Sequence, residues 1–543
     1  MKNVFILTLY LLLILKGNSS NSSYDYSSYS AISTNTNLSG QTVTSSTSDQ
    51  SAVYITSSGI TINDSTIQKT SGDSSNTENS EFYGVNAAVL VQGGGVTITD
   101  GTITTAAKGA NAVCATNGGT VTISGTTITS TGSGSARGLH STYGGTITAS
   151  DVTISSTGGS CATLATDRGE GTVTCSGCTL NTAGAGSPLI YSTGTITAKG
   201  CTGTASGAQM VVVEGKNTAI VQDKSSLKCS GVGNRNNVDN CGVFLYQSMS
   251  GDADVGTSTF TCKDSTLEID SSSSVYSSAP MFFITNTDSV INLEGCTFNY
   301  GSGTFLNAGA TSEWGTSGSN GGTVTLTLTN QDIEGDFIVD SYSSLTINMV
   351  NSSIKGKINT NKVSSTVGVT LDADSTITLT GNSYISSLSN SDSTGSNINK
   401  GSYTFADYNG NSYTATGTDT TTDTVTDSVA DTVTDTETET ATDTITETVT
   451  ETVKETETAK DTVKETATDI GTESVIDKLT DVGIDSTPTT STEANSDTPK
   501  VPDSNFPQEN ANETDNFSLL NFVRNNISII IPIFSIIMLI FLS

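Results

Sequence analysis

The sequence contains few of the residues on which most catalytic and nucleic-acid-binding proteins depend. Its 543 residues include one histidine, His140, one tryptophan, and four arginines at positions 137, 168, 235 and 524. Acidic residues outnumber basic ones by 54 to 22, and the formal net charge is −32. Because phosphate binding needs clustered lysine and arginine, we expect no nucleic-acid partner.

Acid–base arrangements typical of hydrolases and lyases are also missing. No two aspartates are adjacent, and no carboxylate near His140 in the sequence completes a dyad with it. The favoured interpretation of His140 is an outward-facing strand residue. The Asp-x-Asp pairs at 252/254 and 372/374 lack the longer acidic loop that a calcium site requires. We therefore expect no catalytic residues, no cofactor and no metal ion.

The two longest apolar runs lie at the two ends of the chain. Lys2, an apolar stretch from Val4 to Leu15 and small polar residues after it predict a secretory signal at 1–20. The apolar run at 527–542 has no lysine or arginine after it, which predicts a GPI-attachment signal within 511–543. Asn510 and Asn512 are the candidate attachment residues. A single transmembrane span is the alternative; either anchor predicts a location on the extracellular face of the plasma membrane.

Residues 416–510 form a low-complexity segment in which threonine alternates with aspartate and glutamate. Between 418 and 500 there are 21 acidic residues and five lysines. Like charges repel, and little apolar surface is present to bury, so we expect a disordered stalk. A helix with valine at every fourth position is the alternative, which the dense threonine disfavours.

Residues 30–415 contain a repeat. Five equivalent positions, separated by 25, 26, 26 and 23 residues, mark successive copies of one phrase: Val96, Val121, Ile147, Val173 and Ile196. A period of this length is typical of a solenoid. Within each phrase, β-branched apolar residues alternate with threonine, which predicts strands.

The repeat predicts an all-β fold of stacked coils, each about 4.8 Å above the last. Val121, Ile147, Val173 and Ile196 should share one interior column, with threonine and serine facing outward. Beyond Ile220 the phrases are more widely spaced, which predicts inserted loops on one side.

The phrase T-V-T-I-S-G-T-T-I at 120–128 and its copies resemble right-handed parallel β-helix proteins of the pectin-lyase-like superfamily. The segment 379–388, L-T-G-N-S-Y-I-S-S-L, is similar to the end of secreted, adhesin-like β-helices of bacteria. The resemblance implies a right-handed parallel β-helix. It does not decide the function, because the superfamily contains both enzymes and non-enzymatic surface proteins. The G-H-G and R-x-K elements of its hydrolases are missing here.

Nine cysteines in a secreted chain favour disulfides. Aligning 172–180 with 195–203 places Cys178 opposite Cys201. Stacked coils bring such Cα atoms to about 4.8 Å, within the range that a disulfide spans, so we predict a Cys178–Cys201 bridge. Cys175 aligns with Ala149 and Ala198 and should face the core. A metal or redox half-site at 175–178 is disfavoured, since no second CxxC or histidine lies nearby.

N-glycosylation sequons provide candidate glycan sites at Asn21, Asn37, Asn63, Asn351 and Asn512.

Taken together, these features predict a non-enzymatic cell-surface protein, an adhesin or coat protein that contacts glycans or other surfaces. A polysaccharide-active lyase or hydrolase with a non-standard site is one alternative, and an inert spacer is another. Two carboxylates within about 10 Å of each other in a cleft would favour the enzyme.

Overall fold

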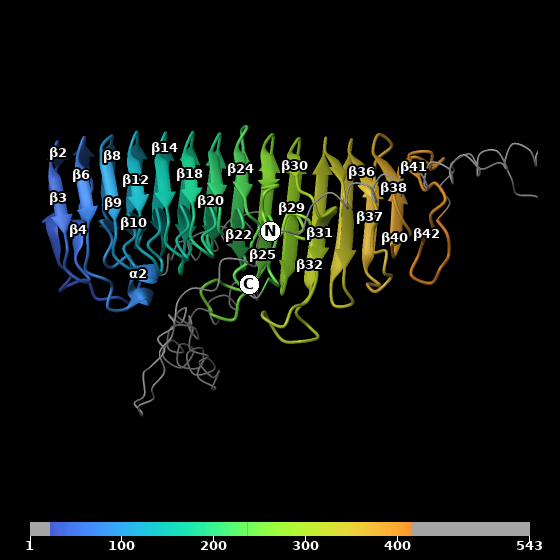
Figure 1. The fold of residues 1–543 in the computed structure, drawn as a ribbon, viewed down its shortest axis with the longest axis horizontal. Coiled ribbons are helices and arrows are strands. Elements are labelled where there is room, and N and C mark those ends of the chain that lie inside the picture. The colour runs from blue at the N-terminus through green and yellow to red at the C-terminus, as the bar shows by residue number, and fades with distance from the viewer. Residues whose placement is uncertain (1–21, 236, 414–543) are drawn as a thin grey trace, which may run out of the picture. The chain divides into compact units, whose positions relative to one another are not determined.

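The computed structural model describes residues 22–235 and 237–413, and this part of the chain is a parallel β-helix (Figure 1). Every pairing between its named strands is parallel, and each strand pairs with the equivalent strands of the coils before and after it. The predicted all-β solenoid is confirmed. Each regular coil has three strands, one in each of three long sheets.

The strands fall into the following sheets. Sheet A contains β1 (Ala31–Thr34), β4 (Ser51–Ile55), β7 (Val89–Gln92), β10 (Val113–Thr116), β13 (Leu139–Ser141), β16 (Leu164–Thr166), β19 (Ile190–Ser192), β22 (Val211–Glu214), β25 (Val243–Tyr246), β28 (Phe282–Thr285), β31 (Thr304–Ala308) and β34 (Asp336–Val339). Sheet B contains β2 (Leu38–Ser39), β5 (Ile60–Asn63), β8 (Gly95–Thr99), β11 (Thr120–Ser124), β14 (Thr146–Ser150), β17 (Thr172–Ser176), β20 (Thr195–Lys199), β23 (Thr218–Gln222), β26 (Ser258–Lys263), β29 (Thr287–Glu294), β32 (Gly322–Thr329), β35 (Ser344–Val350), β37 (Val367–Leu371) and β40 (Ser387–Asn390). Sheet C contains β3 (Thr42–Ser45), β6 (Thr66–Lys69), β9 (Thr102–Thr105), β12 (Thr127–Ser130), β15 (Thr153–Ser156), β18 (Thr179–Thr182), β21 (Thr202–Ala205), β24 (Ser226–Cys229), β27 (Thr266–Ile269) and β30 (Thr297–Asn299). In the last coils, sheet D takes the place of sheet C in chain order, with β33 (Asp332–Glu334), β36 (Ser353–Gly356), β38 (Thr376–Leu379) and β41 (Ile398–Asn399), and a short sheet E pairs β39 (Ser383–Tyr384) with β42 (Phe405–Ala406).

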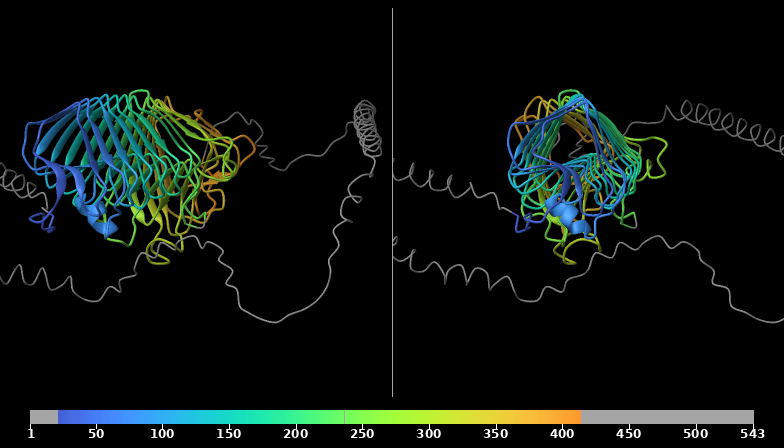
Figure 2. Two further views of the ribbon diagram at one scale, coloured as in Figure 1. Left: turned by 60° about the vertical axis from the view of Figure 1, so that its left-hand side comes forward. Right: turned by 90° about the vertical axis from the view of Figure 1, so that its left-hand side faces the viewer.

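Sheets A, B and C enclose a tube of roughly triangular cross-section, seen end-on in Figure 2. Apolar columns fill it. The predicted column is confirmed, because Val121 pairs with Ile147, Ile147 with Val173, and Val173 with Ile196, and all four are buried. A second column in sheet C contains Ile103, Ile128, Ile154 and Leu180. Burial of these aliphatic side chains supplies the main driving force for stacking.

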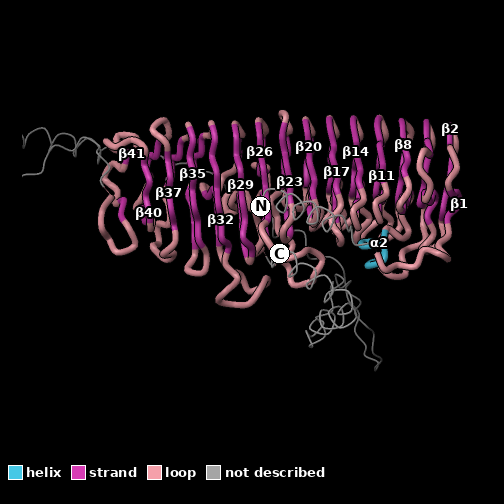
Figure 3. The backbone as a smooth tube through the Cα atoms, turned by 180° about the vertical axis from the view of Figure 1, so that it is seen from behind, coloured by secondary structure: helices cyan, strands magenta, loops and turns pink. Residues whose placement is uncertain are grey.

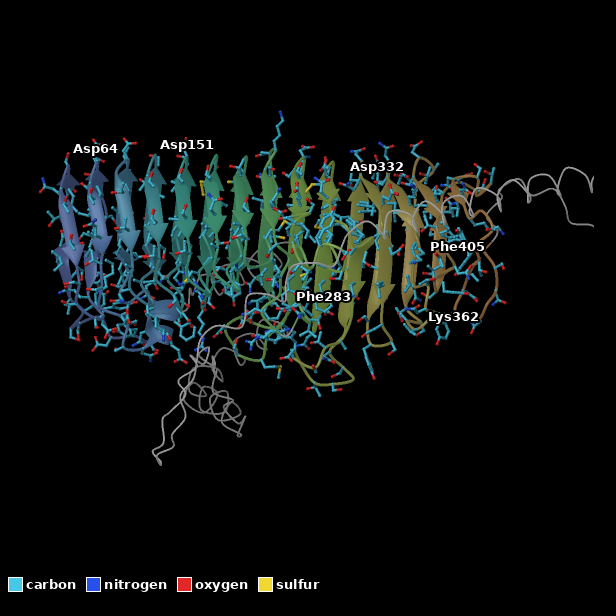
Figure 4. All side chains as sticks on the ribbon, in the orientation of Figure 1. Asp64, Asp151, Phe283, Asp332, Lys362 and Phe405 are labelled. Carbon is cyan, nitrogen blue, oxygen red and sulfur yellow. A yellow bond between two sulfur atoms is a disulfide. The ribbon has the colours of Figure 1, made fainter. Side chains whose placement is uncertain are left out.

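The corner between sheets B and C is formed by residues that adopt a left-handed backbone conformation. Asp64 has φ 46° and Asp151 has φ 54°, and both lie along the upper edge in Figure 4. In the coil after Asp151, Gly177 takes the corner position with φ 64°. Aspartate, asparagine and glycine tolerate this conformation better than other residues, which explains why they recur after the sheet B strands from β2 to β35.

Longer connections project from the opposite side of the tube. The helix α2 (Thr77–Tyr83) lies there, together with the loops 230–242, 247–257 and 309–321 (Figures 1 and 3). Asn76 caps α2 by accepting a hydrogen bond from Glu78 N, and Gly84 ends it with φ 71°. The lengthened steps beyond Ile220 thus correspond to loops on one side, as predicted.

Three predicted segments lie wholly outside the described residues: the signal at 1–20, the stalk at 416–510 and the anchor at 511–543. Asn21, Asn510 and Asn512 fall outside as well. Among the residues that are described, no helix is long and apolar enough to cross a bilayer.

Candidate functional site

The outer side of sheet A differs from the outer sides of sheets B and C because other segments cover it. Its outward-pointing residues are paired from coil to coil, and among them are Leu90, Cys114, His140 and Ala165. All four are buried. We call this surface the covered face. It carries most of the buried titratable side chains of the β-helix, so it is the first place to look for chemistry.

His140 and Arg137 form the centre of the covered face. Arg137 Nη1 donates a hydrogen bond of 2.7 Å to Asp167 Oδ2 and lies 3.3 Å from His140 Nε2. His140 Nε2 is 2.6 Å from the carbonyl oxygen of Glu81 in α2, so this nitrogen donates to the helix. His140 therefore does face outward, as predicted. It is fully buried, however, because α2 covers it.

Burial shifts the titration of this cluster. Burial, and then the charge of Arg137, lower the pKa of His140 well below its usual value. Burial raises the pKa of Asp167 to about 7, against the opposing effect of Arg137. The histidine is thus neutral at physiological pH, and Asp167 is the hydrogen-bonding partner of Arg137. Sequence inspection near His140 did not reveal this acid, because Asp167 belongs to the next coil.

A second buried acid, Glu214, ends strand β22. Its carboxylate accepts hydrogen bonds from Tyr191 Oη at 2.6 Å and Tyr246 Oη at 2.7 Å, and also from the Ser248 hydroxyl. Only 1% of Glu214 is exposed, and burial raises its pKa despite these three donors. The sequence signal was present but weak: Val211, Val212 and Val213 form an apolar run that ends in an acid.

Aromatic side chains continue the covered face beyond Glu214. Phe244 stacks on Phe283, with ring centroids 5.6 Å apart, and Trp314 meets the Tyr246 ring edge-on at 4.8 Å. Arg235 lies over the Trp314 ring at 5.3 Å. Loops 230–242 and 309–321 supply Arg235 and Trp314, whereas Phe283 belongs to strand β28 and is labelled in the lower half of the β-helix in Figure 4. Aromatic and cation–π contacts thus hold the loops onto the sheet.

Ion pairs fasten the loop 247–257 to the same side. Arg168 Nη2 is 3.0 Å from Asp252 Oδ1, and Lys216 Nζ is 2.9 Å from Asp254 Oδ2. The guanidinium of Arg168 also lies 3.9 Å from the centroid of the Phe82 ring in α2. The Asp-x-Asp pair at 252/254 therefore binds basic side chains of this chain. The pair at 372/374 lies elsewhere, where Asp372 accepts hydrogen bonds from the backbone of Asn351 and Ser375.

In chemical terms, the covered face contains two carboxyl groups with raised pKa values, a neutral imidazole and a guanidinium, but all of them are buried beneath α2 and the loops. Asp167 is 3% exposed and His140 is not exposed at all. The enclosed groups bind α2 and the loops to the sheet. An open groove of about 580 Å³ lies elsewhere, at the corner between sheets B and C, and is lined in part by Asp223, Lys224, Asp264 and Gly295.

The outer side of sheet B, in contrast, is open to solvent and carries threonine in register. Two outward columns run across adjacent strands, and we call their nine members the Thr array: Thr97, Thr120, Thr122, Thr146, Thr148, Thr172, Thr174, Thr195 and Thr197. Each of these threonines is exposed or half-buried. Neighbours within a column are about 4.8 Å apart, and neighbours within a strand about 6.6 Å apart. The predicted outward hydroxyl surface is therefore confirmed.

The cysteines pair differently from the prediction. Cys178 is bonded to Cys175, with Cα atoms 6.1 Å apart, and Cys201 is a free thiol. The left-handed turn at Gly177 directs Cys178 back into the tube, where it meets the inward-facing Cys175. The predicted Cys178–Cys201 bridge is thus wrong, although Cys175 does align with Ala149 and Ala198 as expected. A second disulfide joins Cys262 to Cys296.

Among the described sequons, Asn37 and Asn351 are exposed and Asn63 is half-buried. Asn351 Nδ2 donates to Asn330 Oδ1 at 2.7 Å.

Comparison with known proteins adds no assignment to this geometry. No protein-family model, no curated protein and no solved structure matches the chain.

Proposed function

We propose that this chain is a non-enzymatic binding protein of the cell surface, an adhesin or coat protein, whose β-helix contacts glycans through the Thr array. The observation that carries the proposal is the array itself: two columns of outward threonines in register over consecutive coils. A repeating flat surface of this kind suits a ligand that also repeats, such as a polysaccharide chain.

The chemistry of the Thr array supports weak, multiple contacts. Among the described residues, 22–235 and 237–413, the hydroxyls of Thr122, Thr148 and Thr174 form no hydrogen bond with another protein group, so they remain available to a ligand. A single hydroxyl contact contributes only about 0.5–1.5 kcal/mol net. Many equal contacts along one chain of sugars, and many copies of the protein on one surface, would add up to useful avidity.

Sheet B suits this role better than the other faces. The covered face is enclosed, and the outer side of sheet C is less uniform, because Asn181 takes a threonine position there and Lys228 pairs with Glu268 at 2.7 Å. We therefore place the contact surface on strands β8 to β20 of sheet B.

The chain's location and ancestry are also proposals, which rest on the sequence. The signal at 1–20, the acidic stalk and the tail at 511–543 support a secreted protein held on the extracellular face of the plasma membrane by a GPI anchor or a single transmembrane span. The T-V-T-I phrases support membership of the pectin-lyase-like superfamily, with the right-handed helix that this implies.

The test is binding of the full-length secreted chain to an array of polysaccharides and host-type glycans. The triple variant Thr122→Val, Thr148→Val, Thr174→Val removes three hydroxyls and keeps the β-branched shape. We expect it to lose binding by at least about tenfold, which corresponds to about 1.4 kcal/mol. The matched control carries Thr127→Val, Thr153→Val and Thr179→Val on sheet C of the same coils, and should bind normally.

If the wild-type chain binds no glycan, or the sheet B variant binds as well as wild type, the proposal is wrong. The first of these results would favour an inert spacer.

A polysaccharide-active enzyme is the second candidate, and the raised pKa values of Asp167 and Glu214 favour it. Such an enzyme would need α2 or the loop 247–257 to open. Reducing-end and unsaturated-product assays on polygalacturonate and xylan decide between the two. Activity that the Glu214→Gln change abolishes would establish the enzyme instead.

A further inference from the structure

Three cysteine side chains from two successive coils meet inside one corner of the β-helix. Cys175 is the last inward-facing residue of β17. Cys178 follows the turn after that strand, and Cys201 occupies the equivalent position in the next coil. All three are buried, and their sulfur atoms lie within 4.8 Å of one another. Cys201 Sγ donates a hydrogen bond to the carbonyl oxygen of Cys175 at 3.4 Å. The disulfide Cys175–Cys178 therefore has a free thiol beside it.

The second disulfide shows how such a position can be bridged across coils. Cys262 occupies the same inward column of sheet B as Cys175, because the residues pair in register from Cys175 through Ala198 and Val221 to Cys262. Cys296 follows the sheet B strand and turn of the coil after the one that contains Cys262. Cys201 has the same relation to Cys175. Cys175 and Cys201 are thus the structural counterparts of a pair that is bonded elsewhere in this chain.

We propose that Cys175, Cys178 and Cys201 form a disulfide-exchange site, in which the bond joins Cys175 either to Cys178 or to Cys201. In the exchange, the Cys201 thiolate attacks Cys175 Sγ. The bond between Cys175 and Cys201 forms as the bond between Cys175 and Cys178 breaks, and Cys178 leaves as a thiolate that takes up the proton Cys201 gave up. The number of disulfides does not change, so the step needs no oxidant or reductant.

The two states differ in what they join. The Cys175–Cys178 bond closes a turn within one coil, whereas a Cys175–Cys201 bond closes a loop of one whole coil and fastens that coil to the next. In the chain-entropy account, a disulfide that closes a longer loop restricts the unfolded chain more. The exchange would therefore raise the resistance of these two coils to unfolding. Burial raises the pKa of the Cys201 thiol, so we expect a slow reaction at neutral pH.

Peptide mapping of the native full-length chain tests the proposal directly. The protein is held at pH 9, samples are quenched in acid with N-ethylmaleimide over time, and then digested with trypsin. Cleavage after Arg168, Lys199 and Lys216 gives a peptide 169–199, with Cys175 and Cys178, and a peptide 200–216, with Cys201. We expect a covalently linked pair of these peptides to accumulate, and its fragmentation to place the bond on Cys175. A bond on Cys178, or no linked pair at any time, would overturn the proposal.

Two variants sharpen the result. Cys178→Ser removes the competing partner, and after oxidation with oxidised glutathione it should give the linked pair as its main product. Cys161→Ser, which removes another buried free thiol, is the matched control and should behave as wild type. Alkylation of both Cys175 and Cys201 in a folded Cys178→Ser protein would refute the exchange site. If that variant does not fold, the wild-type time course decides the matter alone.

Discussion

At the scale of single residues, the buried polar groups of the covered face hold α2 and the loops against sheet A. His140 donates to the backbone of α2, Arg137 binds Asp167, and Glu214 accepts from three hydroxyls on neighbouring strands and a loop. Each of these polar groups has a partner, which is the condition under which burial of a charge or a carboxyl group is tolerated. Removing one partner would leave the other unpaired and would loosen the cover.

The raised pKa of Glu214 predicts a pH dependence of stability. A carboxyl group that is harder to ionise in the folded state stabilises that state below its unfolded pKa of 4.5, and this stabilisation is lost as pH rises through the folded value. Asp167 acts in the same direction between 3.8 and about 7. We expect the melting temperature, followed by circular dichroism from pH 4 to 8, to fall less steeply for Glu214→Gln than for wild type.

The matched control is Glu334→Gln, which alters an exposed glutamate paired with Lys355 on the surface. Exposed pairs contribute little, so its pH profile should follow wild type. Equal slopes for wild type and Glu214→Gln would mean that Glu214 ionises as freely in the folded chain as in the unfolded one.

At the scale of elements, the interior columns predict where substitutions are costly. Ile147 is fully buried between Val121 and Val173, so Ile147→Ala should destabilise its coil by about 2–5 kcal/mol. Thr148, its exposed neighbour in β14, serves as the control, and Thr148→Ala should change stability by no more than about 0.5 kcal/mol. Hydrogen-exchange mass spectrometry resolves the affected strands. Equal protection of β14 in both variants would contradict the column.

The same elements show which parts of the fold were predictable from the sequence. The repeat length between Val96 and Ile196 is nearly constant, and equivalent residues of successive coils face the same side of their sheet. The interior columns and the outward threonines could therefore be predicted from spacing alone. The cover of sheet A did not follow. α2 is not part of the repeat, and its contact with His140 joins residues 59 positions apart. That Asp167 and Glu214 are buried on the same face can be recognised only from the stacked coils, because the two residues lie far apart in the sequence.

The cysteine pairing shows a further limit of the repeat alignment. Alignment gives the distance between Cα atoms of stacked coils, and this was compatible with Cys178–Cys201. The direction of the Cβ bond decides the partner: Cys178 and Cys201 follow the same left-handed turn, at Gly177 and Gly200, so their side chains lie side by side, whereas Cys175 and Cys178 face each other across one corner.

At the scale of the whole molecule, the proposed placement of the β-helix on a stalk makes a prediction about attachment. If the tail at 511–543 is exchanged for a lipid, no peptide remains in the bilayer. A phospholipase specific for GPI anchors should then release the chain from intact cells, and mass spectrometry of the released protein should not detect peptides from 527–542. A chain that stays on the cells and retains this segment would instead have a transmembrane span.

The unbroken register between β8 and β20 has a consequence for how such a gene can change. Each strand there pairs residue for residue with the next, so an in-frame loss or duplication of one coil would join strands that are already equivalent. The hydrophobic columns and the threonine columns would remain continuous and would be one coil shorter or longer. Alleles that differ in length by whole coils should therefore be tolerated in this segment, whereas changes of a few residues should not.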